Sequence, residues 1–305
     1  MTAICILSSA EDVHARRVFE EVAGLGADVA IVDLSGAREL TFDGDAVRVD
    51  DAVIDGGTVV WSRRPGQREV DARVVDHRLV TFVQHQWQHG FHGAVAATGC
   101  RIVNDPQRER RAQYKPWQLA VAAASGLRVP RTLVTNAPGK AEAFRAELAR
   151  LGHRTIFKPL TPLLFHLGET REFTEGLATG ETLELAPVIF QQCVERGVDL
   201  RLFVVGDRVV PAAVRSRHDE LIDWRVDPDA AYEPAELPPA TLRSVAAAVA
   251  AMGLDTASVD LRLDDRGDLY FFEANPAGQF LMLEPPLQVN LSRILAEHLI
   301  AQRTG

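Results

Sequence analysis

The feature of this sequence that most restricts the fold is the segment Asp260–Gln279, which reads DLRLDDRGDLYFFEANPAGQ. Apolar and polar residues alternate on both sides of the sequence DRGD, and this pattern predicts a β-hairpin that turns there. An ideal turn with Arg266 and Gly267 at its centre places Asp260 directly opposite Glu273, with about 5 Å between their Cβ atoms. The hairpin is therefore expected to bring two carboxylates together on one face.

This face has the composition of a magnesium site. Asn275 follows Glu273 by two residues and so shares its side of the strand. Two facing carboxylates repel each other unless a cation lies between them, and the oxygen donors of Asp260, Glu273 and Asn275 suit Mg²⁺. The alternative is an exposed hairpin with solvated acids, but these acids lie inside the strands rather than at the turn. Magnesium on so few protein ligands usually also binds nucleotide phosphates. The opposite face is predicted to point into the core and carries Val259, Leu261, Leu263, Tyr270, Phe272 and Ala274.

Length and composition restrict the class of protein. With 305 residues, of which 47% are hydrophobic, the chain is long enough for two or three subdomains with cores. The net charge of −9 argues against a dedicated nucleic-acid binder. Cys5, Cys100 and Cys193 lie far apart, so neither a zinc site nor a disulfide framework is indicated. No apolar run approaches the roughly 20 residues of a membrane span, and the start of the chain does not read as an export signal. We expect a soluble, cytoplasmic protein.

The order of the predicted elements divides the chain into three parts, residues 1–107, 108–187 and 188–305. Strands and helices alternate in the first part, which predicts an open, largely parallel α/β sheet. The second part contains helices and the strand Thr155–Pro159, followed by a loop with little pattern, Leu160–Gly180, which we expect to be mobile. The third part is predicted to be mostly antiparallel and to end in a helix over 288–302.

Two groups of polar residues stand out in the first part. Ligands of parallel sheets gather at the carboxyl ends of the strands, which makes Arg63, Arg64 and Asn104 candidate cleft residues. A solvated surface position is the alternative for the two arginines. The second group, His85, His89 and His92 with Gln88, recurs at helical spacing within a predicted helix over 70–97. We favour a polar helix face near a subunit contact over a second metal site.

Two features in the middle of the chain suit a nucleotide. Lysine is rare, and Lys158 ends a buried strand from which a compact cation can reach a phosphate. Lys115, at the start of a helix, can reach another. The apolar strand Val188–Val194 ends abruptly in polar residues. Such a strand edge can offer backbone N–H and C=O groups to an adenine ring, with Glu195 beyond it to hold the ribose hydroxyls.

The next hairpin supplies cations for a transferring phosphoryl group, namely Arg201 and Arg215. An ideal two-residue turn at Gly206-Asp207 places them on opposite faces, whereas a bulge at Pro211 would bring them together. No protein nucleophile and no single general base can be identified. The candidates for the base are Asp199, Asp219 and Glu284.

Taken in order, these residues resemble the ATP-grasp fold over about 109–305. The resemblance implies the α/β (α+β) class, with an ATP-grasp fold preceded by an open, largely parallel α/β pre-ATP-grasp domain, and it implies ATP and Mg²⁺ as cofactors. The residues implied to bind the nucleotide are Lys115, Lys158, Gln192, Cys193, Val194, Glu195 and Asp199, although Cys193 also reads as a packing residue. Lys158, Arg201 and Arg215 are implied to neutralise the transferred group, and Asp260, Glu273 and Asn275 to bind Mg²⁺.

Three further motifs are similar to the ATP-grasp ligases of the microviridin or graspetide type. They are Trp61-Ser-Arg-Arg-Pro, Ser216 with Asp223-Trp-Arg225, and Glu273-Ala-Asn-Pro-Ala-Gly-Gln-Phe280 followed by Glu284. Such enzymes are implied to phosphorylate Asp or Glu side chains of a ribosomal precursor peptide, which has a leader and an acidic core. A hydroxyl or amine of the same peptide then closes a lactone or lactam macrocycle. A homodimer is also implied.

Two other functions compete with this one. A small-molecule, RimK-like ATP-grasp ligase that joins amino acids or adds Glu to a terminus would have the same ATP site. The first domain and Asp223-Trp-Arg225 favour a peptide substrate instead. A non-catalytic nucleotide-binding regulator is disfavoured, because such a module does not need the complete set of Lys158, Asp260, Glu273 and Asn275.

Overall fold

The computed structural model describes residues 2–66, 68–161, 170–175, 177, 181–195, 197–216 and 222–303. The chain forms two compact units. The first comprises Met1–Glu109, Gly253–Thr256 and Pro276–Gly305, and the second comprises Arg110–Met252 and Ala257–Asn275. The predicted part 188–305 is therefore not one compact unit, because its C-terminal helix packs against the first helix of the chain. A boundary at 187/188 within the second unit stays a prediction.

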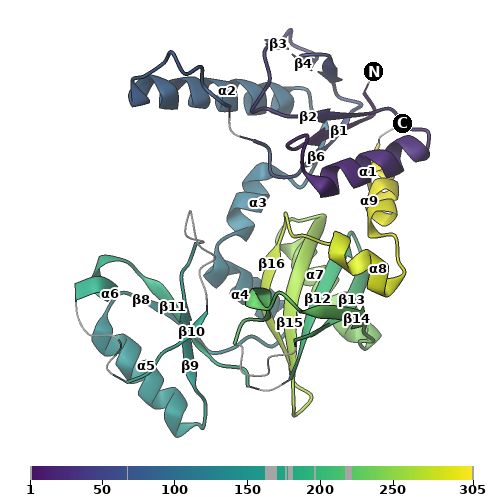
Figure 1. Ribbon diagram of the computed structural model, residues 1–305. Helices are drawn as coiled ribbons and strands as arrows, with labels where there is room; N and C mark the ends of the chain where they lie inside the picture. Colours follow the sequence, from purple (N-terminus) through teal and green to yellow (C-terminus); the bar gives the residue numbers. More distant parts are fainter. Residues whose placement is uncertain are drawn as a thin grey trace. The chain divides into compact units, whose positions relative to one another are not determined.

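A parallel sheet forms the centre of the first unit (Figure 1). In the order β2-β1-β6-β7, its strands are Val29–Val32, Ile4–Leu7, Val59–Ser62 and Arg101–Val103. Each neighbouring pair is parallel, which confirms the predicted open, largely parallel sheet. Strands β1 and β6 are fully buried, as expected for short apolar runs covered on both faces. One face packs against α1 (Val13–Gly24) and α9 (Leu291–Ala301).

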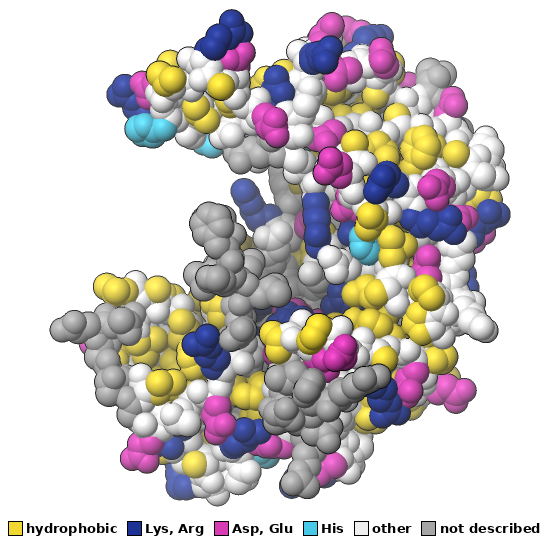
Figure 2. Space-filling model, viewed as in Figure 1, with side chains coloured by type: hydrophobic (Ala, Val, Ile, Leu, Met, Phe, Trp, Pro, Cys, Tyr) yellow, Lys and Arg dark blue, Asp and Glu magenta, His cyan; other side chains and the backbone are white. Residues whose placement is uncertain are grey.

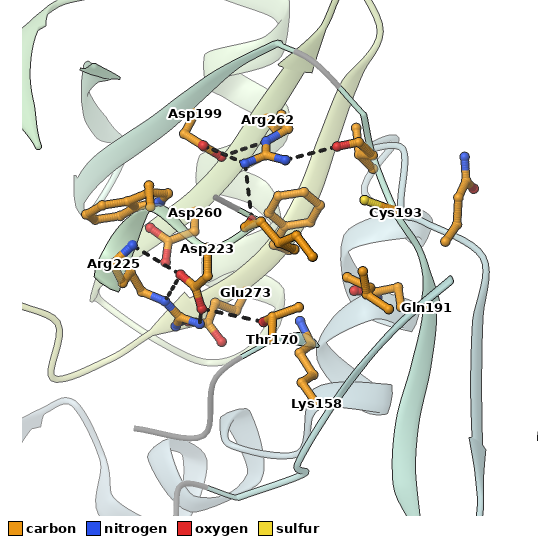
Figure 3. A pocket seen from close by; sticks show the side chains of 16 residues that line it. Lys158, Thr170, Gln191, Cys193, Asp199, Asp223, Arg225, Asp260, Arg262 and Glu273 are labelled. Carbon is orange, nitrogen blue, oxygen red and sulfur yellow. Dashed lines mark hydrogen bonds and ion pairs between the residues drawn. The ribbon is translucent and has the colours of Figure 1, made fainter. Parts of the chain in front are cut away.

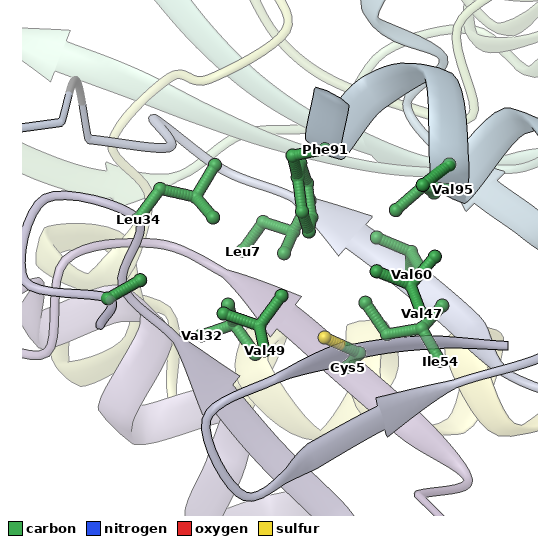
Figure 4. Close-up of a cluster of buried hydrophobic side chains, with 12 residues drawn as sticks. Cys5, Leu7, Val32, Leu34, Val47, Val49, Ile54, Val60, Phe91 and Val95 are labelled. Atoms are coloured by element: carbon green, nitrogen blue, oxygen red, sulfur yellow. The ribbon is translucent and has the colours of Figure 1, made fainter. Parts of the chain in front are cut away.

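The other face of this sheet is covered by α2 (His77–Ala97) and by a small antiparallel sheet that the sequence pattern did not predict. Its strands β3, β4 and β5 are Leu40–Phe42, Val47–Val49 and Ala52–Ile54. Figure 4 shows the resulting core, in which Phe91 and Val95 of α2 meet Val47 and Ile54 of the small sheet. Helix α2 begins at His77 rather than at residue 70, because the Asp76 carboxylate caps it by accepting the backbone N–H of Arg78.

The chain enters the second unit within α3 (Pro106–Ala112), and this unit contains two sheets. One has the order β10-β9-β11-β8, with strands Arg171–Glu172, Thr155–Lys158, Val188–Gln192 and Thr132–Thr135. The other has the order β14-β13-β12-β15-β16, with strands Ala231–Pro234, Arg208–Arg215, Gly197–Val205, Thr256–Asp264 and Leu269–Asn275.

Short helices complete both units. Those of the second unit are α4 (Lys115–Ala124), α5 (Pro138–Arg150), α6 (Glu181–Leu185), η1 (Trp224–Val226) and α7 (Pro239–Ala251). The first unit adds η2 (Leu281–Leu283) and α8 (Glu284–Leu287).

Most of the loop 160–180 that was predicted to be mobile lies outside the described residues. Among the described helices none is long and apolar enough to cross a membrane. Figure 2 shows that basic and acidic side chains are interspersed over the visible face.

The β15–β16 hairpin contains the predicted pairing of Asp260 with Glu273 but reaches it by a different route. Its loop is one residue longer than predicted, because Gly267 adopts φ +84° and closes a three-residue loop after Asp264. A β-bulge next to Asp260 then shifts the register back by one residue. The two deviations cancel at the carboxylate pair.

The bulge also decides which aromatic side chains reach the core. Because a shift of one residue exchanges the two faces of a strand, Phe271 pairs with Leu261 and is 1% exposed. The prediction that Phe272 points into the core beside Leu261 was therefore wrong, whereas Tyr270 is buried as predicted, with 9% of its surface exposed. Tyr270 pairs with Arg262, and Phe272 lines the pocket described below.

Candidate active site

A pocket opens within the second unit, and side chains from both of its sheets line it (Figure 3). Ile156 and Lys158 come from β9, and Gln191 to Val194 come from the end of β11 and the residues after it. The remaining lining residues are Thr170, Asp199, Ile222, Asp223, Trp224, Arg225, Asp260, Arg262, Phe272 and Glu273. In Figure 3 the charged residues Asp223, Arg225, Asp260 and Glu273 gather on one side, opposite Gln191 and Cys193.

Ion pairs from three elements hold the two carboxylates. Arg201 donates from Nη1 to Oδ1 of Asp260 at 2.6 Å, and both side chains are 7% exposed. Glu273 accepts from Lys115 Nζ at Oε2, at 2.9 Å, and from Arg225 Nη1 at Oε1, at 2.8 Å. The predicted convergence of Lys115, Arg201, Asp260 and Glu273 is therefore present in the structure.

The charges at this site shift the pKa values of its members in opposite directions. Burial alone would raise the pKa of Glu273, but Lys115, Arg225 and Lys158 outweigh it and lower the pKa to about 2. Burial raises the pKa of Asp260 against the opposing charge of Arg201, and nearby Glu273 adds to the rise. Burial lowers the pKa of Lys158 to about 8, although Glu273 opposes this effect. Glu273 is thus held ionised, whereas Lys158 titrates close to neutral pH.

The carboxylate pair fits a hard divalent cation. Asp260 and Glu273 face each other across the β15–β16 ladder, and both offer oxygen donors from a position that water reaches poorly. Their negative charge is now balanced by Lys115, Arg201 and Arg225, so a metal ion would take over part of that role. Asn275, the third predicted ligand, is exposed and is not among the described residues that line the pocket.

Of the two predicted phosphoryl-binding arginines, only Arg201 reaches this site. Strands β12 and β13 pair without interruption, so Pro211 lies opposite Leu202 and forms no bulge. Arg215 consequently points to the other face, where its side chain is 57% exposed and pairs with Glu233 at 2.8 Å. The geometric objection raised by the ideal turn is correct, and the structure does not bring Arg215 to the pocket.

The segment predicted to bind adenine lines the pocket, but β11 is an interior strand and not an edge. The backbone N–H of Gln192 donates to the carbonyl of Arg131, and that of Cys193 donates to Arg154, each at 2.9 Å. Cys193 is 3% exposed, in agreement with a packing role. Beyond the strand, Glu195 is held by Arg154 through bonds of 2.6 and 2.9 Å, and it does not line the pocket among the described residues.

Sequence reasoning missed two arginines of the pocket. Arg262 follows Asp260 by two residues on the same strand, so the alternation that located Asp260 could also have located it. Arg225 was noted only as part of a motif. The guanidinium of Arg225 donates to both carboxylate oxygens of Asp223, from Nε at 2.8 Å and from Nη2 at 2.7 Å. Its Nη1 also donates to Oε1 of Glu273. Such a contact between distant segments leaves no signal in local spacing.

The candidate cleft residues of the first unit have structural roles there. Arg63 is 2% exposed, pairs with Asp12 at 3.2 Å and donates to the carbonyl of Gly278 at 3.2 Å. Arg64 donates to the carbonyl of Ala277 at 3.0 Å. Asn104 is also buried and accepts the backbone N–H of Thr256 at 3.0 Å. These residues fasten the loop that follows β16 and the start of β15.

Of the two described candidates for a general base, Asp199 lines the pocket and Glu284 does not. Glu284 accepts both the backbone N–H and the hydroxyl of Ser292, at 2.7 and 2.8 Å, within the first unit. Both carboxylate oxygens of Asp199 are bound by Arg262, at 2.8 and 2.6 Å. Asp219 lies outside the described residues.

Comparison with known proteins identifies the fold. The RimK-like ATP-grasp domain matches residues 112–299. The chain is 26% identical over 229 residues to the probable alpha-L-glutamate ligase 2 of Shewanella amazonensis, which covers 68% of this chain and 73% of that protein. Macrocyclase MdnC of Microcystis aeruginosa, bound with its precursor peptide MdnA, superposes with a TM-score of 0.86 at 22% identity, over 99% and 100% of the two chains. ATP-grasp ligase PsnB, complexed with a phosphomimetic variant of its minimal precursor, Mg and ADP, gives 0.81 at 24% identity, over 100% and 99%.

Proposed function

This chain belongs to the RimK-like ATP-grasp family of ligases, and we propose that it activates carboxylates of a ribosomal precursor peptide with ATP to close macrocycles. The observation that carries this proposal is the cross-strand pair of buried Asp260 and partly buried Glu273, which faces a pocket lined on its other side by the end of β11. The charged side suits the phosphates of a nucleotide and Mg²⁺. The side formed by Ile156 and Gln191 to Val194 suits its base.

Residues that line the pocket, together with Lys115, Arg201 and Asn275 beside them in the sequence or in ion pairs with the carboxylates, have distinct roles in this proposal. Lys115 and Lys158 bind nucleotide phosphates, and Arg201 neutralises the transferred phosphoryl group. Asp260 and Glu273 would hold Mg²⁺, with Asn275 as a further ligand. The bound cation would offset the negative charge of the phosphates and so reduce their repulsion of an incoming carboxylate. A cation bound at Glu273 would weaken the ion pair between Glu273 and Arg225, so that Arg225 could interact with the phosphates as well.

The proposed reaction has two steps. An oxygen of a substrate carboxylate attacks the γ-phosphorus of ATP, the bond to the β-phosphate oxygen breaks, and ADP leaves, which gives an acyl phosphate. A hydroxyl or amine of the substrate then attacks the acyl carbon, loses its proton and expels inorganic phosphate. The chain supplies position and electrostatic stabilisation, and no protein nucleophile is needed.

The peptide substrate is supported by the solved structures that resemble the whole chain. MdnC and PsnB were both captured with precursor peptides, and each superposes on nearly every residue of this protein, including the first unit. We therefore propose a precursor peptide with a leader and an acidic core as the partner. A lactone or lactam would be the product, and a homodimer the assembly.

A second candidate is the ligation of glutamate to an amino acid or a peptide terminus. Sequence similarity to the probable glutamate ligase of Shewanella amazonensis favours it. Both reactions use the same nucleotide pocket, so only the acceptor distinguishes them.

The test is incubation of the purified protein with ATP, Mg²⁺ and either acidic, Thr-rich peptides encoded beside its gene or free glutamate with acceptor peptides. We expect ADP formation and the loss of one water mass from a peptide for each ring closed. A gain of glutamate mass would establish the second candidate instead. Absence of ADP with every acceptor would refute the ligase proposal. Glu273→Ala is the matched control: any ADP that the wild type forms in this pocket should disappear in this variant.

A further inference from the structure

Arg262 connects four segments of the pocket. Its Nε and Nη2 donate to the two carboxylate oxygens of Asp199, at 2.8 and 2.6 Å. Its Nη1 donates to the backbone carbonyl of Val194 at 2.9 Å. The guanidinium also lies over the ring of Phe272, 5.8 Å from the centroid, and Nη2 reaches the carbonyl of Ile222 at 3.5 Å. One planar fork thus joins β15 to β12, to the end of β11, to β16 and to the segment before η1.

This arrangement costs desolvation free energy, so a contribution to stability alone does not account for it. The side chains of Arg262 and Asp199 are 12% and 13% exposed, so both charges lose most of their hydration. Buried ion pairs contribute little net stability compared with apolar residues of the same size. They do fix geometry, because a planar fork with several bonds leaves few alternative positions. The geometry fixed here is that of Val194, in the segment where the base of the nucleotide would lie.

We propose that Arg262 is a positioning residue of the nucleotide pocket, which fixes the backbone at Val194 and thereby sets the preference for adenine over guanine nucleotides. This inference rests on the proposed function, because it requires that the pocket binds a nucleotide. Adenine presents an exocyclic amino group where guanine presents a carbonyl oxygen. Backbone donors and acceptors that cannot rotate reject the wrong base, since a mismatched base leaves a buried polar group without a partner.

The proposal also assigns a role to Asp199. Because Arg262 occupies both of its carboxylate oxygens, Asp199 is not available as a general base. Its role is to hold the guanidinium in the plane that points Nη1 at Val194. Lysine at position 262 would keep the charge next to Asp199 but would lack the fork that joins Asp199 to Val194.

The experiment is calorimetric titration of the full chain with ADP and GDP in the presence of Mg²⁺. Arg262→Lys tests the fork. The double variant Arg262→Met with Asp199→Asn removes both charges together, so that neither remains buried without its partner. Arg215→Lys is the matched control, because that arginine pairs with Glu233 outside the pocket. Thermal unfolding of each variant without nucleotide reports whether it is folded.

We expect the wild type and Arg215→Lys to prefer ADP. Both pocket variants should lose about tenfold or more in ADP affinity, with a smaller change for GDP, so that the ratio of the two affinities falls. A purely structural role would leave this ratio unchanged in the folded protein. Folded variants that keep the wild-type ratio would refute the inference while leaving the proposed function intact. If neither variant folds, Arg262 is a core residue and the inference is wrong. A wild type that binds neither nucleotide would overturn the proposed function and the inference together.

Discussion

Replacing Glu273 by glutamine gives the most quantitative test of the carboxylate pair. The substitution keeps the shape of the side chain but removes the charge that Lys115 and Arg225 hold at 2.9 and 2.8 Å. The pKa of Glu273 is lowered from 4.5 to about 2, and each unit corresponds to about 1.4 kcal/mol. With only 15% of the side chain exposed, solvent screening removes little of this effect. The ionised Glu273 therefore contributes about 3 kcal/mol to the free energy of unfolding at neutral pH.

The contribution has a defined dependence on pH. Because the folded-state pKa lies below the unfolded-state value, the stabilisation is complete well above the unfolded pKa and is lost as the pH falls through the folded pKa. We expect urea unfolding of Glu273→Gln to differ from the wild type by about 3 kcal/mol at pH 7 and by roughly 1 kcal/mol at pH 3. Glu233→Gln, in an exposed pair with Arg215, should change the free energy by less than about 1 kcal/mol.

A Glu273→Gln protein as stable as the wild type at pH 7 would refute this reasoning. It would mean that Lys115, Arg225 and Lys158 do not favour the ionised form of Glu273. The same variant should form no ADP under conditions in which the wild type turns over. Activity at the wild-type level would contradict the proposed metal site, whatever its effect on stability.

Three further predictions concern other parts of the second unit. Burial lowers the pKa of the Lys158 ammonium to about 8, so this group should lose its proton as the pH rises through that value. ADP affinity, measured by titration, should then fall by up to about tenfold for each pH unit above it. Lys158→Arg, which stays charged, should show no such fall. Arg201→Met leaves the buried carboxylate of Asp260 without its partner and should lower the free energy of unfolding in urea by about 3–5 kcal/mol. Arg215→Met, at the surface, should lower it by less than about 1 kcal/mol. Equal losses of stability would contradict the placement of the two arginines on opposite faces. At Gly197 an added Cβ would clash with the backbone carbonyl oxygen of Leu263 in β15, so Gly197→Ala should lower the thermal midpoint by several degrees. Gly139→Ala, whose added Cβ meets open space, should leave the midpoint unchanged or raise it. Similar midpoints for the two variants would show that β12 and β15 do not approach this closely.

Much of the fold followed from local patterns. The apolar runs Ile4–Leu7 and Val59–Ser62 are buried strands of the parallel sheet that the alternation of strands and helices predicted for the first part of the chain. The small sheet over residues 40–54 was missed, because its strands are only three residues long and carry exposed residues such as Arg48. The return of the chain from Pro276 to the first unit was also missed, since packing between segments so far apart leaves no periodic signal.

The predicted placement of the candidate site residues matches the structure where alternation along one strand was enough to fix it. Asp260 and Glu273 are cross-strand partners, and Lys158 ends its strand in the pocket. The pairing held even though the turn and the bulge were both unforeseen, because a longer loop and a bulge shift the register in opposite directions. The same bulge moved Phe272 from the predicted core to the pocket.

The sequence by itself determined which side chains alternate to one face, and therefore the carboxylate pair and the ATP-grasp resemblance. Only the tertiary structure decided which cations meet that pair. Arg201 and Arg215 look equivalent in the sequence, but an uninterrupted β12–β13 ladder directs one to Asp260 and the other to solvent. Arg262 acquires its role from segments more than 60 residues away. The physical reason is that alternation is set within a strand by backbone geometry, whereas ion pairs are set by how strands, bulges and loops bring distant residues together.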